Sequence, residues 1–307
     1  MSTRVTRDPS QAAAVLARGG LVALPTETVY GLAADVTRTD AVRRIFAVKG
    51  RPTDHPLIVH IADPDDLMQW SAGPSHAARR LAALAWPGPL SVIVPRDGRI
   101  ADAVTGGRDT VAVRCPAHDL ARDVIRRLGR PVAAPSANRF GRVSPTTAQH
   151  VIDDLGDDVD LVLDGGPCSV GLESTIVDCT VDPVQILRHG GLPAEQVAAL
   201  LEGPVAPASG PRRAPGMLEM HYAPSCRVHP VETVADAADL ETALSRTGAV
   251  TAHLDLSGDV VQAARGLYGA LRDADRQGAT DLVVVLPRAA GLGVAVRDRV
   301  SRAAAGR

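Results

Sequence analysis

The segment VAAPSANRFGRVSPTTA, residues 132–148, contains the pattern from which the fold can be deduced. The apolar run at 132–134 predicts a short strand, which leads directly into the polar turn Pro135-Ser136-Ala137-Asn138. Ser144 and Pro145 are residue types that favour a helix N-cap and a first helical position, so a helix is predicted at 145–155. A strand, a polar turn and a helix in this order indicate an α/β domain.

The same alternation continues through the first two thirds of the chain, where segments with helical periodicity alternate with short apolar runs that are typical of strands. Helices are predicted at 8–18, 39–49, 117–128, 145–155 and 193–201, with one or two more within 63–84. Strands are predicted at 21–24, 57–61, 90–94, 110–114, 132–134, 161–163, 175–178 and 185–188. Together these elements predict a twisted mixed sheet flanked by helices.

The composition changes at 204–226, where prolines, glycines and small residues replace the hydrophobic period, so this stretch is predicted to be a linker. Helices are then expected at 241–245, 260–276 and 294–304, and strands at 249–254 and 282–286. The sequence therefore predicts a first domain at 1–203, a linker at 204–226 and a small α/β domain at 227–307.

The composition also excludes some classes of protein. The 307 residues are 45% hydrophobic and 22% charged, as in a globular protein. A net charge of −2 and an aromatic content of 2% do not provide the surface that tight nucleic-acid binding needs. Because there is neither an apolar run of membrane-spanning length nor a signal-peptide core at the N-terminus, we expect no membrane association and a cytoplasmic location.

Metal-binding and disulfide patterns are also missing from the sequence. The four cysteines have no C-x-x-C spacing, and the nine histidines follow no ligand pattern. The cysteines are therefore expected to be small buried side chains, and no structural metal is expected.

One short motif stands out against the arginine-rich composition. Of the 33 basic residues, only Lys49 is a lysine, and it lies in the sequence Lys49-Gly50-Arg51. An ammonium beside a guanidinium fork suits a phosphate group. The alternative is that Lys49 only marks a helix end, where a cation is favoured by the helix dipole.

Further polar side chains lie at the ends of predicted strands. Ser136 and Asn138 follow one strand, although both are also ordinary turn residues. Thr110 and Arg114 share one face of another strand if that strand is regular. Arg114 and Arg188 are the stronger signals, because a guanidinium buried in an apolar strand needs an anionic partner.

Seven ordered strings give the chain a clear resemblance to the YrdC-type L-threonylcarbamoyladenylate synthase family. They are PTETVYGL (25–32), KGRPTDHPLIVH (49–60), WPGPL (86–90), TVAVRCP (110–116), APSANRFGRVSPTTA (134–148), DGGPCSVGLESTIVD (164–178) and ILRHGGL (186–192). The later strings APGMLEMHYAP (214–224) and GLGVAVRDRVSRAAA (291–305) resemble the long, two-domain branch. The resemblance implies a YrdC-like sheet with a concave active-site cavity and a small Rossmann-like second domain.

The resemblance also implies a reaction. Enzymes of this family join L-threonine, bicarbonate and ATP into threonylcarbamoyl-AMP and release pyrophosphate, with magnesium accompanying the ATP. A downstream threonylcarbamoyl transferase complex then modifies transfer RNA. The carbamate formed from threonine attacks the α-phosphate, so no protein nucleophile is needed, and catalysis rests on positioning and charge stabilisation.

Each matched position acquires an implied role, and no protein side chain is implied as a metal ligand. The implied catalytic residues are Lys49 and Arg51. The implied ATP-binding residues are Lys49, Arg51, His55, Thr110, Ser136, Asn138, Ser144, Arg188 and Tyr222. The implied threonine-binding residues are Thr28, His60, Arg114, Ala134 and Ser174. Because Tyr222 lies in the predicted linker, the linker is expected to act as a lid over the reactive anhydride.

The chain departs from the family pattern at several positions, and two other functions stay open. His55 stands where asparagine or lysine is usual, and Ala214, Glu219 and Met220 alter the linker motif. A paralogue that makes a related carbamoyl-adenylate in a biosynthetic pathway is one alternative. A non-catalytic RNA-binding module is the other, although the balanced charge argues against it. The sequence does not indicate the oligomeric state, the transfer partner or the role of the second domain, which looks shortened around 230–250.

Overall fold

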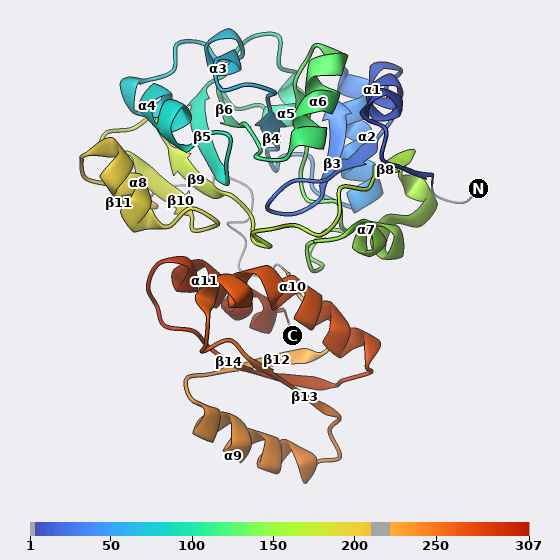
Figure 1. Cartoon of the computed structure of the whole chain (residues 1–307), viewed down its shortest axis with the longest axis vertical. Coiled ribbons are helices and arrows are strands. Elements are labelled where there is room, and N and C mark those ends of the chain that lie inside the picture. Colours follow the sequence, from blue (N-terminus) through green and yellow to red (C-terminus); the bar gives the residue numbers. More distant parts are fainter. Residues whose placement is uncertain (1–3, 210–221, 307) are drawn as a thin grey trace.

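The structure is a computed structural model that describes residues 4–209 and 222–306. The linker positions Ala214, Glu219 and Met220 therefore lie outside the described residues. The chain forms a large domain above and a small domain below (Figure 1).

The large domain is built on an 11-stranded mixed sheet. In spatial order its strands are β1 (Val5–Thr6), β8 (Leu161–Leu163), β2 (Val22–Leu24), β3 (Gly31–Asp35), β7 (Val132–Ala133), β4 (Ile58–His60), β6 (Thr110–Arg114), β5 (Leu90–Pro95), β9 (Thr175–Asp178), β10 (Gln185–Arg188) and β11 (Ala206–Pro207). Parallel and antiparallel pairs both occur, so the predicted mixed sheet is confirmed. Strand β11 extends this sheet from within the region predicted as a linker.

Eight α-helices accompany these strands in the described part of the large domain. They are α1 (Pro9–Ala17), α2 (Thr39–Lys49), α3 (Asp66–Gln69), α4 (His76–Ala85), α5 (Asp102–Thr105), α6 (Asp119–Leu128), α7 (Ala148–Leu155) and α8 (Ala194–Leu201), with a 3-10 turn at Gly156–Asp158. Helices α2, α4 and α7 pack on one face of the sheet through the main core. Helices α1 and α6 cover the other face only over β8, β2, β3 and β7.

The uncovered part of that second face decides where a ligand can bind. Over β4, β6, β5, β9 and β10 a separate apolar cluster consists of strand residues only: Ile58, Ile93, Ala112, Ile176 and Leu187. His60 and Arg114 lie two residues after Ile58 and Ala112 and are paired in register, so they share this face. The half of the face without helices is therefore free to form a cavity.

Two local features of the sequence produce the geometry near this face. Gly50 adopts a left-handed conformation (φ 64°) that ends α2 and turns Arg51 away from the helix axis. The predicted N-cap of the helix at 145–155 is wrong: α7 begins at Ala148, and Thr147 accepts the capping bond from the His150 amide. The reason is that the Ser144 hydroxyl donates to Glu173 instead.

The small domain contains a three-stranded parallel sheet with β14 (Asp281–Val285) between β12 (Arg227–Val231) and β13 (Thr251–Asp255). Its helices are α9 (Val234–Ser245), α10 (Val260–Arg276) and α11 (Leu292–Ala304). Strand β12 was not predicted, and α9 begins seven residues before the predicted 241, at a capping box formed by Thr233 and Asp236.

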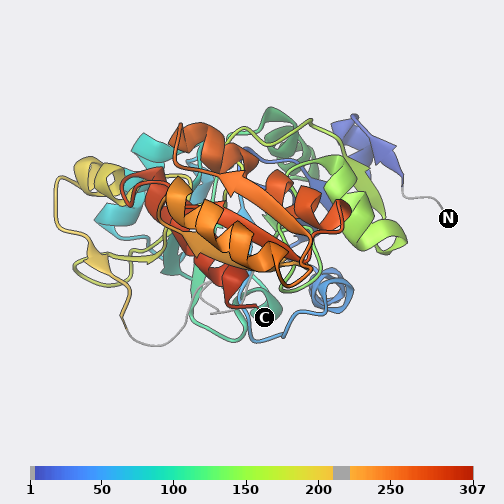
Figure 2. The ribbon, with the colours of Figure 1, turned by 90° about the horizontal axis from the view of Figure 1, so that it is seen from below.

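The two domains share one apolar core. Helices α10 and α11 face the large domain, whereas α9 lies on the far side (Figures 1 and 2). Val29, Val143 and Leu172 of the large domain belong to the cluster built by these two helices. At Gly171 (φ +78°), an added Cβ would lie 2.6 Å from the Arg265 Cα of α10, so this position requires glycine.

All four cysteines are buried and free, which confirms the prediction that they are buried. None of the helices in the described ranges is long and apolar enough to cross a membrane.

The orientation of α2 can be tested by a matched pair of substitutions. Ile45 is fully buried in the main core, whereas Arg43 on the same helix is exposed. We expect Ile45→Ala to lower the free energy of unfolding by about 2–5 kcal/mol, because it leaves a cavity. Arg43→Ala should change it by less than about 0.5 kcal/mol in urea denaturation. Equal losses in the two variants would contradict this orientation.

Candidate active site

A cavity opens on the uncovered part of the sheet and collects residues from distant parts of the chain. Its lining consists of Thr26, Thr28, Val29, Gly31, Arg51, Ile58, His60, Arg114, Ala134, Pro135, Ser136, Glu173, Ser174, Arg188 and Tyr222. Nine of the predicted site residues are therefore brought together: Thr28, Arg51, His60, Arg114, Ala134, Ser136, Ser174, Arg188 and Tyr222.

One end of the cavity is organised by Arg114, which is almost fully buried at the end of β6. Its Nη1 donates to the Thr28 hydroxyl at 2.8 Å, and its Nε donates to the Gly88 carbonyl at 3.1 Å. Nη2 lies 2.6 Å from a carboxylate oxygen of Glu27, which is itself buried and accepts the Ala117 amide at 3.0 Å. The anionic partner that a buried arginine requires is thus supplied by Glu27.

His60 and Ser174 lie beside this arginine. Burial, reinforced by the neighbouring Arg114, lowers the pKa of His60 to about 3, so its imidazole is neutral at pH 7. The Ser174 hydroxyl lies 2.8 Å from that of Ser91 and accepts Arg188 Nη2 at 3.1 Å. This end therefore presents a guanidinium, hydroxyl groups and a neutral imidazole.

The other end of the cavity is cationic. Arg51 follows α2 and donates through Nη2 to the Pro56 carbonyl at 3.1 Å, while its buried Nε has no hydrogen-bond partner among the described residues. Burial, together with nearby Arg188, lowers the pKa of Arg51 to about 10, so it stays charged at pH 7. Arg188 is held by its Nε bond to the Ser174 carbonyl at 3.0 Å. Two buried cations on one wall favour an anionic ligand.

Lys49 does not line the cavity, although it lies close to it. Its buried Nζ donates to the Ser136 carbonyl at 2.6 Å and to the Asn138 carbonyl. Burial, with Arg51 nearby, lowers the pKa of Lys49. This lysine therefore fixes the turn after β7.

Asn138 and Ser144 also lie just behind the lining residues. Asn138 Nδ2 donates to the Arg139 and Arg142 carbonyls, each at 2.8 Å, and its buried Oδ1 has no partner in the described structure. The Ser144 hydroxyl donates to Glu173 at 2.7 Å. Both residues thus shape the segment that borders the cationic end.

Two predicted ATP contacts are placed farther from the lining. Thr110 shares the face of Arg114 because β6 is regular, but it lies half-buried at the opposite end of that strand. His55 is half-buried, and its ring packs against Phe140 with centroids 5.6 Å apart. Their contact with a nucleotide stays a prediction.

The small domain reaches the cavity through Tyr222, which is buried with its ring 5.6 Å from that of Tyr268. The Arg299 guanidinium lies over the Tyr222 ring, 5.0 Å from its centroid. Sequence reasoning placed Tyr222 at the site but missed the aromatic and cationic partners that hold it.

Three charged residues of this region were missed. Glu27, Glu173 and Arg299 all lie within the family strings given above, but the resemblance implies a role for none of them. Glu173 accepts Ser144, Tyr268 at 2.7 Å and Arg299 at 2.8 Å. Burial alone would raise the pKa of Glu173, but Arg299 and Arg188 hold it at about 2. The available signal was that buried arginines imply buried acids.

Comparison with known proteins agrees with this geometry. A family model described as "Telomere recombination" (Sua5, YciO and YrdC) matches residues 14–190. A second, described as "Threonylcarbamoyl-AMP synthase, C-terminal domain", matches residues 192–305. The threonylcarbamoyl-AMP synthase of Pyrococcus abyssi is 40% identical, over 95% of this chain and 92% of the relative. That of Bacillus subtilis is 39% identical, over 98% and 95%.

Comparison with solved structures also finds a threonylcarbamoyl-AMP synthase relative. The crystal structure of P. abyssi Sua5 complexed with L-threonine superposes with a TM-score of 0.94 at 37% identity, covering 99% of this chain and 97% of that one. Fold and cavity thus define a Sua5/YrdC-type synthase. The chain belongs to the threonylcarbamoyl-AMP synthase family, in its two-domain form.

The neutral state of His60 predicts an acid-sensitive stability. Its pKa is about 3 in the folded protein, against 6.5 for a free histidine, so only the unfolded chain takes up this proton between those values. Stability should therefore fall as the pH drops from 6.5 towards 3, by about 1.4 kcal/mol per pH unit for this group. His60→Gln should remove that share of the slope between pH 6.5 and 4.5 in urea denaturation.

The difference in slope between the two proteins makes this test specific. His150, whose pKa is lowered to about 4 by burial, contributes in the same window and is present in both proteins, so its contribution cancels in that difference. Identical slopes for wild type and His60→Gln would show that His60 is protonated in the folded protein.

Proposed function

We propose that this protein joins L-threonine, bicarbonate and ATP into threonylcarbamoyl-AMP, with release of pyrophosphate, for the modification of transfer RNA. The observation that carries the proposal is a single cavity whose lining holds two groups of cations. Arg114 is bonded to the Thr28 hydroxyl and paired with Glu27, whereas Arg51 lies near Arg188. An amino acid and a triphosphate can therefore lie side by side.

At the first end, the carboxylate of threonine would bind Arg114. A guanidinium has five N–H donors, and the bonds to Gly88, Thr28 and Glu27 leave some of them for the substrate. Thr28, His60 and Ser174 would contact the polar groups of threonine. The methyl group would lie towards the apolar side chains of Ala134 and Ile58.

At the second end, the triphosphate would lie against Arg51 and Arg188, next to Ser136. The threonine amine attacks bicarbonate, an N–C bond forms, a C–O bond breaks and water leaves, which gives a carbamate. An oxygen of the carbamate attacks the α-phosphorus while the bond to pyrophosphate breaks. Arg51 would stabilise the charge that develops on the departing pyrophosphate. Lys49 would act at this end by holding the turn that carries Ser136 and Asn138.

Magnesium would come with the nucleotide. Glu173 is engaged by Arg299 and Tyr268, and Glu27 faces Arg114, so neither carboxylate is available to a metal ion. Within the described residues, no three His, Cys, Asp or Glu side chains are grouped so that they could hold a metal. These donors do not fit a protein-held magnesium ion, and we expect the phosphates to carry it.

The remaining steps extend beyond this chain. A mixed anhydride reacts with water, so we infer that Tyr222, which is buried in the cavity lining, helps to cover the intermediate until it leaves. Residues 210–221 of the predicted lid lie outside the described residues. A separate threonylcarbamoyl transferase complex would consume the product. A cytoplasmic location would fit these substrates and this acceptor.

The direct test is mass spectrometry of the product formed from ATP, bicarbonate and L-threonine. We expect threonylcarbamoyl-AMP together with pyrophosphate, and threonine should stand out when pyrophosphate release is compared across amino acids. Release with another amino acid in preference to threonine would overturn the substrate assignment.

Arg51→Ala tests the cationic end. In the described structure the Arg51 side chain makes one hydrogen bond, to the Pro56 carbonyl, so the variant should fold. We expect the rate of adenylate formation to fall by about 100-fold or more, because one preorganised donor to the developing charge is lost. Arg43→Ala, at an exposed position of the preceding helix α2, should keep the wild-type rate. Retained activity in Arg51→Ala would remove this residue from the mechanism.

Arg114→Lys tests the threonine end while keeping a cation beside buried Glu27. The ammonium cannot form the paired bonds of a guanidinium fork, so the KM for threonine should rise by about tenfold or more. The KM for ATP should change little. A rise confined to ATP would contradict the assignment of the carboxylate to Arg114.

A further inference from the structure

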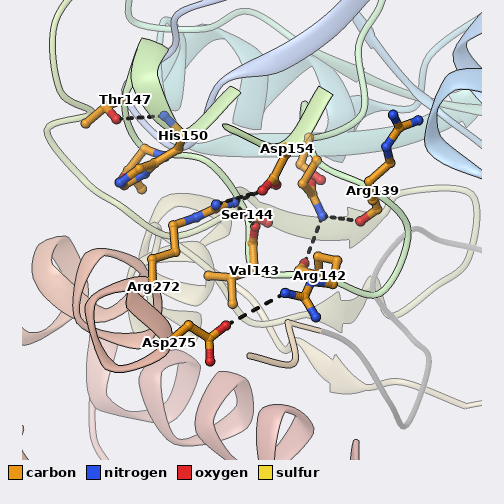
Figure 3. A network of polar contacts seen from close by, with 12 residues as sticks. Arg139, Arg142, Val143, Ser144, Thr147, His150, Asp154, Arg272 and Asp275 are labelled. Atoms are coloured by element: carbon orange, nitrogen blue, oxygen red, sulfur yellow. Dashed lines mark hydrogen bonds and ion pairs between the residues drawn. The ribbon is translucent and has the colours of Figure 1, made fainter. Parts of the chain in front are cut away.

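The segment 138–144 lies between the two domains (Figure 3) and begins two residues after Ser136, which lines the cavity. The large domain holds its beginning: the Phe140 amide donates to the Lys49 carbonyl at 2.7 Å, and Asn138 Nδ2 donates to two carbonyls within the segment. Its proposed ligand contacts, Asn138 and Ser144, lie at its two ends.

Residues beyond the predicted first domain hold the rest of this segment. The Gly141 carbonyl accepts the Ala223 amide at 3.0 Å, and Arg142 donates to the Ser225 hydroxyl at 3.0 Å. Arg142 also forms an ion pair with Asp275 at 3.7 Å. Arg272 donates to the Val143 carbonyl, directly before Ser144.

Arg272 connects this segment to a helix as well. Both oxygens of Asp154 on α7 accept from it, at 2.9 and 2.7 Å, in a bidentate pair (Figure 3). The side chains of Arg272 and Asp154 are only 12% and 15% exposed, so solvent screens the pair weakly. The position of Val143 therefore depends on an arginine of the small domain.

The contacts of α10 come from a single face of that helix. Ala264, Tyr268, Arg272 and Asp275 follow at spacings of four, four and three, which places them in one row. Tyr268 donates to Glu173, the same carboxylate that accepts Ser144, and all three groups are buried. Tyr268 of this row thus binds the Glu173 carboxylate that Ser144 also binds, and Arg272 binds the carbonyl of Val143, the residue before Ser144.

We propose that α10 is a positioning element for the nucleotide end of the cavity, with Arg272 and Tyr268 as its positioning residues. They hold Val143 and Ser144, and with them the segment 138–144, in the arrangement that binds the phosphates. Neither residue contacts Arg114, Thr28 or His60 in the hydrogen bonds of the described structure, so threonine binding should not depend on them. This inference rests on the proposed function, because it takes ATP as the ligand at that end.

The test compares Arg272→Gln with Arg276→Gln. Arg276 lies on the same helix and pairs with Asp273 at the exposed surface, so it is the matched control. In pyrophosphate-release assays of the full chain, we expect Arg272→Gln to raise the KM for ATP by about tenfold, since charge-assisted bonds are lost. The KM for threonine should stay within about twofold, and Arg276→Gln should resemble wild type in both constants.

Two outcomes would overturn the proposal: an unchanged KM for ATP, or equal rises in both constants, which would mean a general loss of structure. If circular dichroism shows that Arg272→Gln does not fold, Tyr268→Phe is read by the same criteria. Calorimetric titration of ATP into each protein without threonine separates this proposal from the proposed function. If the wild type binds ATP but forms no adenylate, the proposed function is refuted. The ratio of the ATP affinities of wild type and Arg272→Gln would still decide the role of α10.

Discussion

Buried positive charge is the constraint on which the architecture of the cavity depends. Arg51, Arg114, Arg188 and Arg299 are all buried in the described structure. An uncompensated buried ion costs several kcal/mol, so such side chains are stable only beside acids or ordered acceptors. Glu27 accompanies Arg114, and Glu173 accompanies Arg299. Each acid is fixed in turn by backbone amides, hydroxyl groups or both, and these contacts link the strand ends to the second domain.

The distribution of these pairs gives the two ends of the cavity different properties. Arg114 is matched by Glu27 and surrounded by hydroxyl groups, which suits a small zwitterion. Arg51 has no acid within salt-bridge distance among the described residues, which suits a polyanion. Arg299 enters from the small domain and anchors Glu173, whose other oxygen receives Ser144. One constraint, the compensation of buried charge, therefore underlies both the proposed ligand selectivity and the proposed positioning role of the second domain.

Much of this arrangement could be predicted from the sequence. The helix at 39–49 and the strand at 110–114 have the predicted bounds, because in both segments the hydrophobic period and the residues at the ends indicate the same limits. The N-cap prediction for Ser144 was wrong, because the Ser144 hydroxyl binds Glu173, a partner 29 residues away. The burial of Arg299 could not be predicted either, because its helical sequence is typical of a surface and its partner Glu173 lies in a distant segment. Contacts between distant segments decide these residues, and local patterns do not encode them.

The most direct measurement is a crystal structure of the full chain with L-threonine and a non-hydrolysable ATP analogue bound together. The account predicts the threonine carboxylate within hydrogen-bond distance of Arg114 and the phosphates within hydrogen-bond distance of Arg51, in one continuous cavity. A second hollow lies nearby, bordered by Arg43, Asp54 and Gly106. Phosphates bound in that hollow, with Arg51 turned away from the threonine, would contradict it.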